Sequence, residues 1–290
     1  MSAPTFDLQS HSTYSDGTLP PAEVVARAAA AGVELLALTD HDTVDGVGEA
    51  LTAARAHGLR VVPAAELSSI DGDHEDLHVL GYEIDHTNKA FLDTLVAFRA
   101  DRAARADRMA QALQELGWTL DTGPLDRRRA AGLPIGRPHL ARAAFDHPHN
   151  APRLQAEGLG DFGQLLEAYL IPGAPAYRRR STPTVAEAIA AIHAAGGAAV
   201  WAHPFWDVDA PADVVAAIDR FAAVGLDGVE AFYITHTREE TEVAARACAE
   251  RGLITTGSAD FHGPDHPRFN RFRAFDLYGL QPDFGNLIRT

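Results

Sequence analysis

Five histidines in this chain each follow or end an apolar run, and acidic residues accompany them. His11 and Asp16 lie in the stretch from Asp7 to Gly17, and the same association recurs further along the chain. It is found at Thr39-Asp40-His41, at Glu66 with His78, at Ala202-His203-Pro204 and at Asp260-Phe261-His262. Imidazole and carboxylate groups suit manganese, iron or zinc, and a set without a thiolate argues against a closed structural zinc site. Because these ligands outnumber what one ion can bind, the pattern predicts at least two ions.

The elements that position these residues alternate between short apolar strands and Ala-rich helices that end at glycine. We expect strands at Phe6–Leu8, Val33–Leu38, Arg60–Leu67, Leu77–Ile84, Ala198–Ala202, Gly228–Phe232 and Leu253–Gly257, with Ala274–Leu277 as a candidate last strand. Such alternation with short links predicts a mostly parallel sheet. Roughly seven strands predict a closed or nearly closed α/β barrel. In such barrels the chemistry gathers at the C-terminal ends of the strands, and the histidines above follow those ends.

The alternation breaks in the middle of the chain. Asn88–Leu116 has a long helical pattern, and the stretch after it contains short helical pieces at His139–Phe145 and Phe162–Leu170 but no convincing strand. We therefore expect residues 100–180 to form a mostly helical insertion or cap domain. Residues 1–99 and 181–290 would together form the barrel.

The composition limits the classes of function. The chain has 290 residues, 46% hydrophobic content and a formal net charge of −15. A negative net charge argues against binding along a long nucleic acid, because that affinity comes from phosphate neutralisation by Lys and Arg. Small phosphorylated substrates remain compatible with it. No apolar run approaches the length of a membrane span and no export signal is evident, so we predict a cytoplasmic protein.

Four motifs together resemble the polymerase and histidinol phosphatase (PHP) family of metal-dependent phosphoesterases. They are Asp-Leu-Gln-Ser-His-Ser-Thr-Tyr-Ser-Asp-Gly, Leu-Thr-Asp-His-Asp, Ala-His-Pro and Ser-Ala-Asp-Phe-His. The segments Gly136–Arg142 and Ala176–Arg180 of the insertion look like the branch that contains 3′,5′-nucleoside bisphosphate phosphatases and the related RNase AM 5′→3′ exonucleases. The resemblance implies a distorted (β/α)7 barrel of the PHP type.

The resemblance also implies a set of metal ligands. Carried over by position, it puts one ion on Gln9, His11, Glu66 and Asp260, a second on Glu66, His78 and His203, and a third on Asp16, His41 and His262. The family's first motif is normally His-x-His, and Gln9 stands at its first histidine. An amide oxygen is a weaker, neutral ligand, so two or three ions are expected, with manganese favoured over iron or zinc. Glu66, His203, Asp260 and Asp40 are the expected catalytic residues. Asp40 and Asp42 are candidates for supporting the metal ligands or for handling protons, with loop capping as the other interpretation of Asp42.

The function implied is hydrolysis of a phosphomonoester by metal-bound hydroxide, and the expected group is the 3′-phosphate of a nucleoside 3′,5′-bisphosphate. Arginine forks suit phosphate oxygens, so the expected contacts to a second phosphate are Arg137, His139, Arg178 and Arg180. The other interpretation is that these residues are solvated on an irregular surface and bind no substrate.

Three alternatives remain open at this level. The first is a 5′→3′ exoribonuclease acting on short RNA. The second is an amidohydrolase, whose common binuclear form needs a carboxylated lysine at a strand end, whereas the chain's single lysine is Lys89. The third is a non-catalytic metal-binding protein in which Gln9 has disabled the chemistry.

Overall fold

The computed structural model describes residues 4–132, 135–179, 182–285 and 287. The chain divides into two compact units, one formed by Met1–Leu95 with Pro183–Thr290 and the other by Val96–Thr182. The first unit contains all the strands of the described residues.

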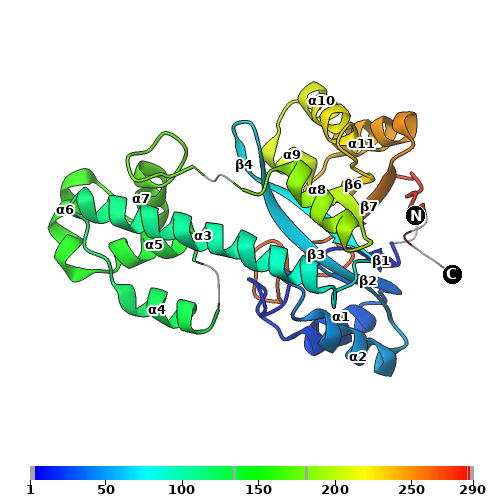
Figure 1. Cartoon of the computed structure of the whole chain (residues 1–290), viewed down its shortest axis with the longest axis horizontal. Coiled ribbons are helices and arrows are strands. Elements are labelled where there is room, and N and C mark those ends of the chain that lie inside the picture. Colours follow the sequence, from blue (N-terminus) through cyan, green and yellow to red (C-terminus); the bar gives the residue numbers. More distant parts are fainter. Residues whose placement is uncertain (1–3, 133–134, 180–181, 286, 288–290) are drawn as a thin grey trace. The chain divides into compact units, whose positions relative to one another are not determined.

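The first unit is built on one seven-stranded sheet whose strands lie side by side in sequence order. The strands are β1 (Phe6–Asp7), β2 (Leu35–Leu38), β3 (Arg60–Asp71), β4 (His74–Tyr82), β5 (Ala198–Trp201), β6 (Gly228–Tyr233) and β7 (Ile254–Ser258) (Figure 1). Main-chain hydrogen bonds from Leu8 to Gly257 (3.1 Å) and from His11 to Phe261 (2.8 Å) join the first strand's continuation to the last strand. The sheet is therefore a nearly closed barrel, as the alternation predicts.

One strand departs from the predicted parallel arrangement. β1, β2 and β3 pair in parallel, as do β5, β6 and β7, but β4 is antiparallel to both of its neighbours. The cause is the tight turn at Gly72, whose φ is 57°. A turn of this length can join antiparallel strands, whereas a parallel pair needs a crossover of a dozen or more residues.

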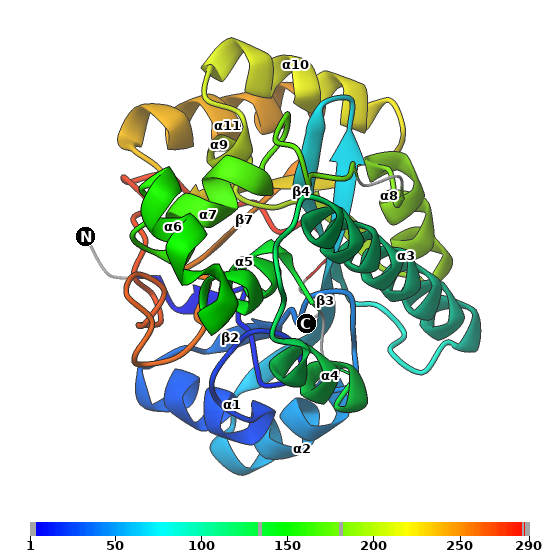
Figure 2. The same ribbon diagram turned by 90° about the vertical axis from the view of Figure 1, so that its left-hand side faces the viewer.

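Helices surround the strands on the outside of the barrel (Figure 2). They are α1 (Pro21–Ala30), α2 (Val47–His57), α8 (Val185–Ala194), the short α9 (Pro204–Asp207), α10 (Pro211–Ala222) and α11 (Arg238–Arg251). α10 illustrates why they pack: its buried Val214, Ile218 and Phe221 recur at helical spacing, and the ring of Phe221 packs against Trp201 of β5. No helix within the described residues is long and apolar enough to cross a membrane.

The predicted strand at Ala274–Leu277 is wrong. No strand forms there, because Arg273 adopts a φ of 61° and its main-chain N–H donates to the buried carboxylate of Asp7 at 2.7 Å. The segment instead packs Phe275 against Phe6 in the barrel core.

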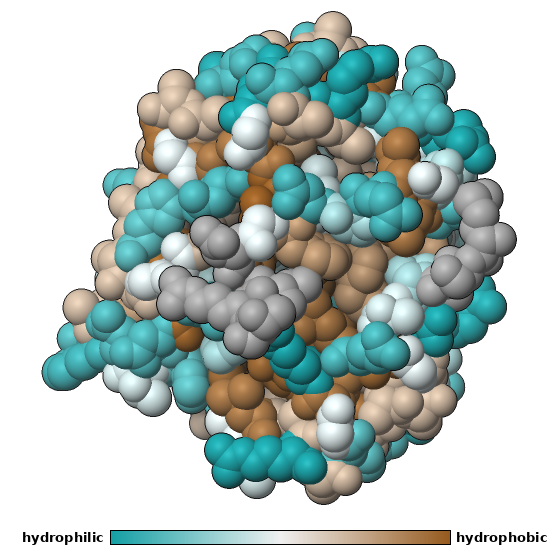
Figure 3. All heavy atoms as spheres, turned by 90° about the vertical axis from the view of Figure 1, so that its right-hand side faces the viewer, coloured by the Kyte–Doolittle hydropathy of each residue, from teal (hydrophilic) through white to brown (hydrophobic). Residues whose placement is uncertain are grey.

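On the face shown in Figure 3, hydrophobic side chains gather near the centre and hydrophilic ones surround them.

The second unit is helical within its described residues. It contains most of α3 (Lys89–Glu115), then α4 (Thr122–Ala130), α5 (Arg137–Phe145), the 3-10 helix η1 (Pro148–Asn150), α6 (Ala151–Glu157) and α7 (Phe162–Tyr169). Its own core includes Leu113, Trp118, Leu140 and Leu165, all nearly or completely buried. The sequence prediction missed α4 and α6 because each carries a proline, but proline fits the first turn of a helix, where its missing N–H has no partner.

Candidate metal centre

Glu66 lies at the centre of the cluster and is fully buried. Its Oε1 is 2.9 Å from His78 Nδ1 and 3.2 Å from His203 Nε2. Its Oε2 is 3.0 Å from Gln9 Nε2 and 3.1 Å from His11 Nε2. The two oxygens of one carboxylate thus face two different sets of side chains.

The remaining predicted ligands lie next to these sets. His11 Nε2 is 3.1 Å from Asp260 Oδ1, and the other nitrogen of the ring is 3.5 Å from Asp16. Asp16 is also 3.5 Å from His41 Nε2 and 3.5 Å from His262 Nε2. The structure therefore brings all nine predicted ligands together in the first unit, at the mouth of the barrel.

The local backbone is unusual at two of these positions. Asp260 has a φ of 54° and His203 a φ of 30°, and neither is glycine. Left-handed conformations cost free energy for such residues and persist where the surroundings determine them, commonly at functional sites. The main-chain N–H of His203 donates to Glu230 Oε2 at 3.0 Å, which holds this turn.

Glu66 and His78 are not at strand ends, which corrects the sequence prediction. β3 and β4 extend past the barrel mouth as a hairpin, so both residues lie within their strands. His41, which follows β2, forms an isolated parallel bridge with Glu66 and so lies beside it.

The carboxylates set the protonation of the histidines around them. Burial lowers the pKa of His78, but the Glu66 carboxylate outweighs burial and the pKa rises to about 9. Burial also opposes protonation of His11, yet the adjacent carboxylates of Asp260 and Glu66 hold its pKa well above the usual value. At His41 burial dominates, and the pKa falls to about 4. Burial raises the pKa of Glu66, but the neighbouring histidines outweigh it and hold that pKa well below the usual range.

Several buried atoms of the cluster fit bound cations. His11 Nε2, His41 Nδ1 and Asp260 Oδ1 are buried and make no well-formed hydrogen bond with any described residue. Buried polar atoms are normally satisfied, so each unsatisfied group calls for a partner. Nitrogen and carboxylate donors that converge in this way suit divalent manganese, iron or zinc.

The carboxylate of Asp40 accepts hydrogen bonds from the loop that carries two predicted ligands. Its Oδ1 accepts hydrogen bonds from Ser12 N and Ser15 Oγ, and its Oδ2 accepts one from Ser12 Oγ, each at 2.7 Å. It therefore fixes the loop that carries His11 and Asp16. Asp42 acts similarly on the next strand, since its carboxylate accepts from the main-chain N–H of Ser68 at 3.0 Å.

Three residues that the sequence prediction missed lie beneath the cluster. Glu230 on β6 is fully buried, and burial raises its pKa well above the usual value. Ser258 Oγ lies 2.6 Å from Glu230 Oε1 and 3.3 Å from Gln9 Oε1. Tyr233 donates a hydrogen bond to Asp260 Oδ2 at 2.8 Å. The available signal was a lone glutamate inside the apolar strand Gly228–Tyr233.

The predicted phosphate contacts lie in the second unit. His139 Nδ1 accepts from the main-chain N–H of Gly136 at 3.0 Å, and Arg137 begins α5. Arg178 donates to the carbonyls of Pro175 (3.1 Å) and Tyr177 (2.8 Å). Arg180 lies outside the described residues.

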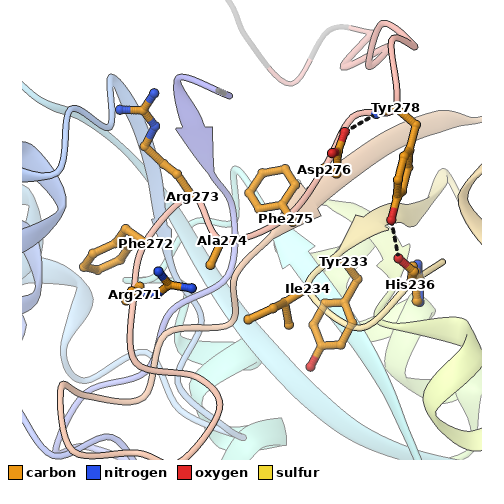
Figure 4. Close-up of a pocket in the computed structure, with 10 residues that line it drawn as sticks. All are labelled: Tyr233, Ile234, His236, Arg271, Phe272, Arg273, Ala274, Phe275, Asp276 and Tyr278. Carbon is orange, nitrogen blue, oxygen red and sulfur yellow. Dashed lines mark hydrogen bonds between the residues drawn. The ribbon is translucent and has the colours of Figure 1, made fainter. Parts of the chain in front are cut away.

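A separate cavity of about 460 Å³ adjoins Tyr233 (Figure 4). It is lined by residues 233, 234 and 236 and by residues 271–276 and 278. His236, which follows β6, contributes to this lining. Tyr278 donates from its hydroxyl to the His236 carbonyl at 3.1 Å. Tyr233 is therefore shared between the cavity and the metal-ligand cluster.

Comparison with known proteins supports one class. A family model described as the PHP domain matches residues 7–119. The chain is 34% identical over 261 residues to a 3′,5′-nucleoside bisphosphate phosphatase of Chromobacterium violaceum, covering 89% of this chain and 87% of the relative. It is 32% identical over 259 residues to a 5′-3′ exoribonuclease of Haemophilus influenzae, covering 89% and 90%.

Solved structures agree on the fold. A Chromobacterium violaceum protein described as an amidohydrolase with bound sulfate and no metal has a TM-score of 0.74 at 32% identity, covering 93% of this chain and 91% of that one. A Bifidobacterium adolescentis protein described as a metal-dependent phosphoesterase has a TM-score of 0.72 at 27% identity, covering 96% and 100%.

Fold, cluster and relatives together define a metal-dependent hydrolase of phosphoester bonds. The chain belongs to the PHP family.

Proposed function

We propose that the protein hydrolyses a phosphomonoester, and that its substrate is the 3′-phosphate of a nucleoside 3′,5′-bisphosphate. The observation that carries the proposal is Glu66, whose two oxygens face separate sets of imidazoles 2.9–3.2 Å away. A carboxylate shared in this way suits two neighbouring cations, the arrangement that clamps the attacking and leaving oxygens of a phosphoryl group. The name of the Chromobacterium violaceum relative supports the substrate.

We propose the three ligand sets that the resemblance implies, and the distances support them. Glu66 Oε1 with His78 and His203 would hold one ion, and Glu66 Oε2 with His11 and Asp260 another. Asp16 with His41 and His262 would hold a third, since their ligand atoms lie within 4.8 Å of one another and of His11. We favour manganese, and Gln9 as a further ligand stays a prediction.

Bound divalent ions would supply Lewis acidity and lower the pKa of a coordinated water to about 7. The chain's own residues orient the ligands. Asp40 holds the His11 loop through Ser12, and Tyr233 donates a hydrogen bond to the Asp260 carboxylate, which fixes one oxygen and leaves the other facing His11. We assign Asp40 a positioning role on this basis.

The proposal retains the prediction that Arg137, His139, Arg178 and Arg180 bind a second phosphate group. Burial lowers the pKa of His139, and Arg128 and Arg102 lower it further. A neutral imidazole beside arginines can donate one hydrogen bond to an anion while the arginines supply the charge.

The alternatives differ in their support. The name of the Haemophilus influenzae relative favours a 5′→3′ exoribonuclease as the second candidate. The binuclear amidohydrolase form is disfavoured, because Lys89 is an exposed residue that pairs with Asp93 at 2.8 Å on the surface of α3.

The test uses the full chain, stripped and reloaded with Mn, Fe, Zn or Mg. We expect phosphate release from adenosine 3′,5′-bisphosphate with Mn or Fe, at a higher kcat/KM than from AMP or short RNA. His203→Ala should abolish release, whereas His57→Ala, an exposed histidine at the end of α2, should not. Faster release of 5′-mononucleotides from RNA would replace the phosphatase with the exoribonuclease. Bound metal without turnover of any phosphoester would support the non-catalytic alternative.

A further inference from the structure

We infer that Trp206, Phe269 and Arg268 form a stacking surface for the base of a nucleotide substrate beside the metal centre. The inference rests on the proposed function, because it identifies the group that the phosphate at the centre carries. Trp206 lies on α9, directly after His203, and its side chain is 48% exposed. A single exposed apolar residue needs no explanation, so its surroundings decide the matter.

Those surroundings form a continuous line of rings. The centre of the Trp206 ring lies 6.5 Å from the centre of the His203 ring and 5.9 Å from the centre of the Phe269 ring. The centre of the Phe269 ring in turn lies 5.4 Å from the centre of the His262 ring. The aromatic surface thus extends outward from two predicted metal ligands that come from different loops. A substrate whose phosphate is held at the centre would have its next group beside these rings.

The surface also carries a cation that the fold does not use. The guanidinium of Arg268 lies 5.5 Å from the centre of the Trp206 ring, and its side chain is exposed. Among the described residues it makes no hydrogen bond or ion pair, since its recorded hydrogen bond comes from the main-chain N–H. An exposed indole next to an available arginine can hold a nucleotide whichever base it carries, through ring stacking and cation–π attraction.

The first test compares a substrate with a base and one without. The metal-loaded full chain is assayed with adenosine 3′,5′-bisphosphate and with the abasic tetrahydrofuran 3′,5′-bisphosphate. Trp206→Ala should lower the ratio of the two kcat/KM values about 10-fold, in line with the effect of removing one stacking ring. Trp206→Phe should retain most of the ratio. Val224→Ala, which alters a residue of equal exposure at the end of α10, should leave it unchanged.

A binding measurement keeps the inference testable without turnover. Trp118 and Trp201 are 2% and 0% exposed, so Trp206 is the one tryptophan of the chain that a ligand can reach. Adenosine 3′,5′-bisphosphate should quench the intrinsic fluorescence in a saturable way, and Trp206→Phe should remove the quenching. The abasic compound should leave the fluorescence unchanged.

The outcomes separate the two claims. Quenching by the nucleotide without hydrolysis of either substrate would contradict the proposed function and support the stacking surface. Hydrolysis with an unchanged ratio in Trp206→Ala would overturn the stacking surface alone. An equal loss on both substrates would also overturn it, because it would show that Trp206 only supports His203.

Discussion

Replacing Glu66 with glutamine tests the centre most directly, because the change removes one negative charge and little volume. Glu66 is the residue on which both imidazole sets converge. Bound cations contribute several kcal/mol of transition-state stabilisation, and each 1.36 kcal/mol is a factor of ten in rate. We expect phosphoesterase activity to fall about 10³-fold or more and the metal content to drop by at least one ion per chain.

The same variant has a calculable effect on the metal-free protein. Glu66 raises the pKa of His78 to about 9, from 6.5. This shift corresponds to about 2–3 kcal/mol of folding stability at pH 7. Because a fifth of the His78 side chain is exposed, solvent screening lowers the figure to about 2 kcal/mol. The folded pKa lies above the unfolded one, so this stability is complete below pH 6.5 and is lost as the pH rises through 9.

The assay is urea unfolding of wild type and Glu66→Gln in chelator, at pH 7 and at pH 9.5. The difference between the two proteins should be at least about 2 kcal/mol at pH 7 and should shrink at pH 9.5, where His78 is neutral in the unfolded state and mostly neutral in the folded state. Glu34→Gln, which alters an exposed carboxylate of the same unit, should show no such dependence. An equal difference at both pH values, or full metal content in Glu66→Gln, would refute the reasoning.

Three further substitutions test the surroundings of the centre. Asp40→Asn removes one acceptor oxygen from a carboxylate that takes three hydrogen bonds, so we expect about 1–3 kcal/mol lower stability and weaker metal retention, measured by unfolding and by elemental analysis. Burial lowers the pKa of His236 to about 4, so the wild type should lose up to about 3 kcal/mol as the pH falls from 6.5 to 4, and His236→Asn should lose less in urea unfolding over that window. Gln9→His should leave phosphate release intact or raise it, with equal or higher metal content by elemental analysis; a clear fall in either would contradict the ligand set.

Local sequence rules predicted most of the barrel because its helices and strands obey them individually. α2 and α11 end at Gly58 and Gly252, which adopt the left-handed conformation that glycine allows without strain. The direction of β4 was not predictable in this way, since apolar periodicity identifies a strand but not its partner. The segment after β7 was misread for a related reason, because its backbone is set by a contact with Asp7, far away in the sequence.

The candidate site was also predictable only in part. Histidines that follow apolar strands are visible in the sequence, and a barrel brings strand ends together, so their convergence could be predicted. The buried acids beneath them could not, because Glu230 and Asp7 look like ordinary strand residues until their neighbours are known. Both are fully buried, and burial raises the pKa of Asp7 to about 7. Asp40 was predicted as a catalytic residue, and that role stays a prediction; its carboxylate accepts hydrogen bonds from Ser12 and Ser15 in the loop of His11, a contact that the sequence does not reveal.

Glutamine at position 9, where the family normally has histidine, changes the hydrogen bonds around Glu66 and the ligand atoms that a cation could use. Its Nε2 donates to Glu66 Oε2 at 3.0 Å, and an amide nitrogen has no lone pair to offer a cation. Its Oε1 accepts from Ser258, which lies 2.6 Å from Glu230, an acid whose pKa burial raises well above its usual value. In this orientation the amide nitrogen holds the shared carboxylate, and Gln9 as a ligand stays a prediction that requires its oxygen to face the ion. A histidine at position 9 would add a ligand nitrogen while giving up the link to Ser258.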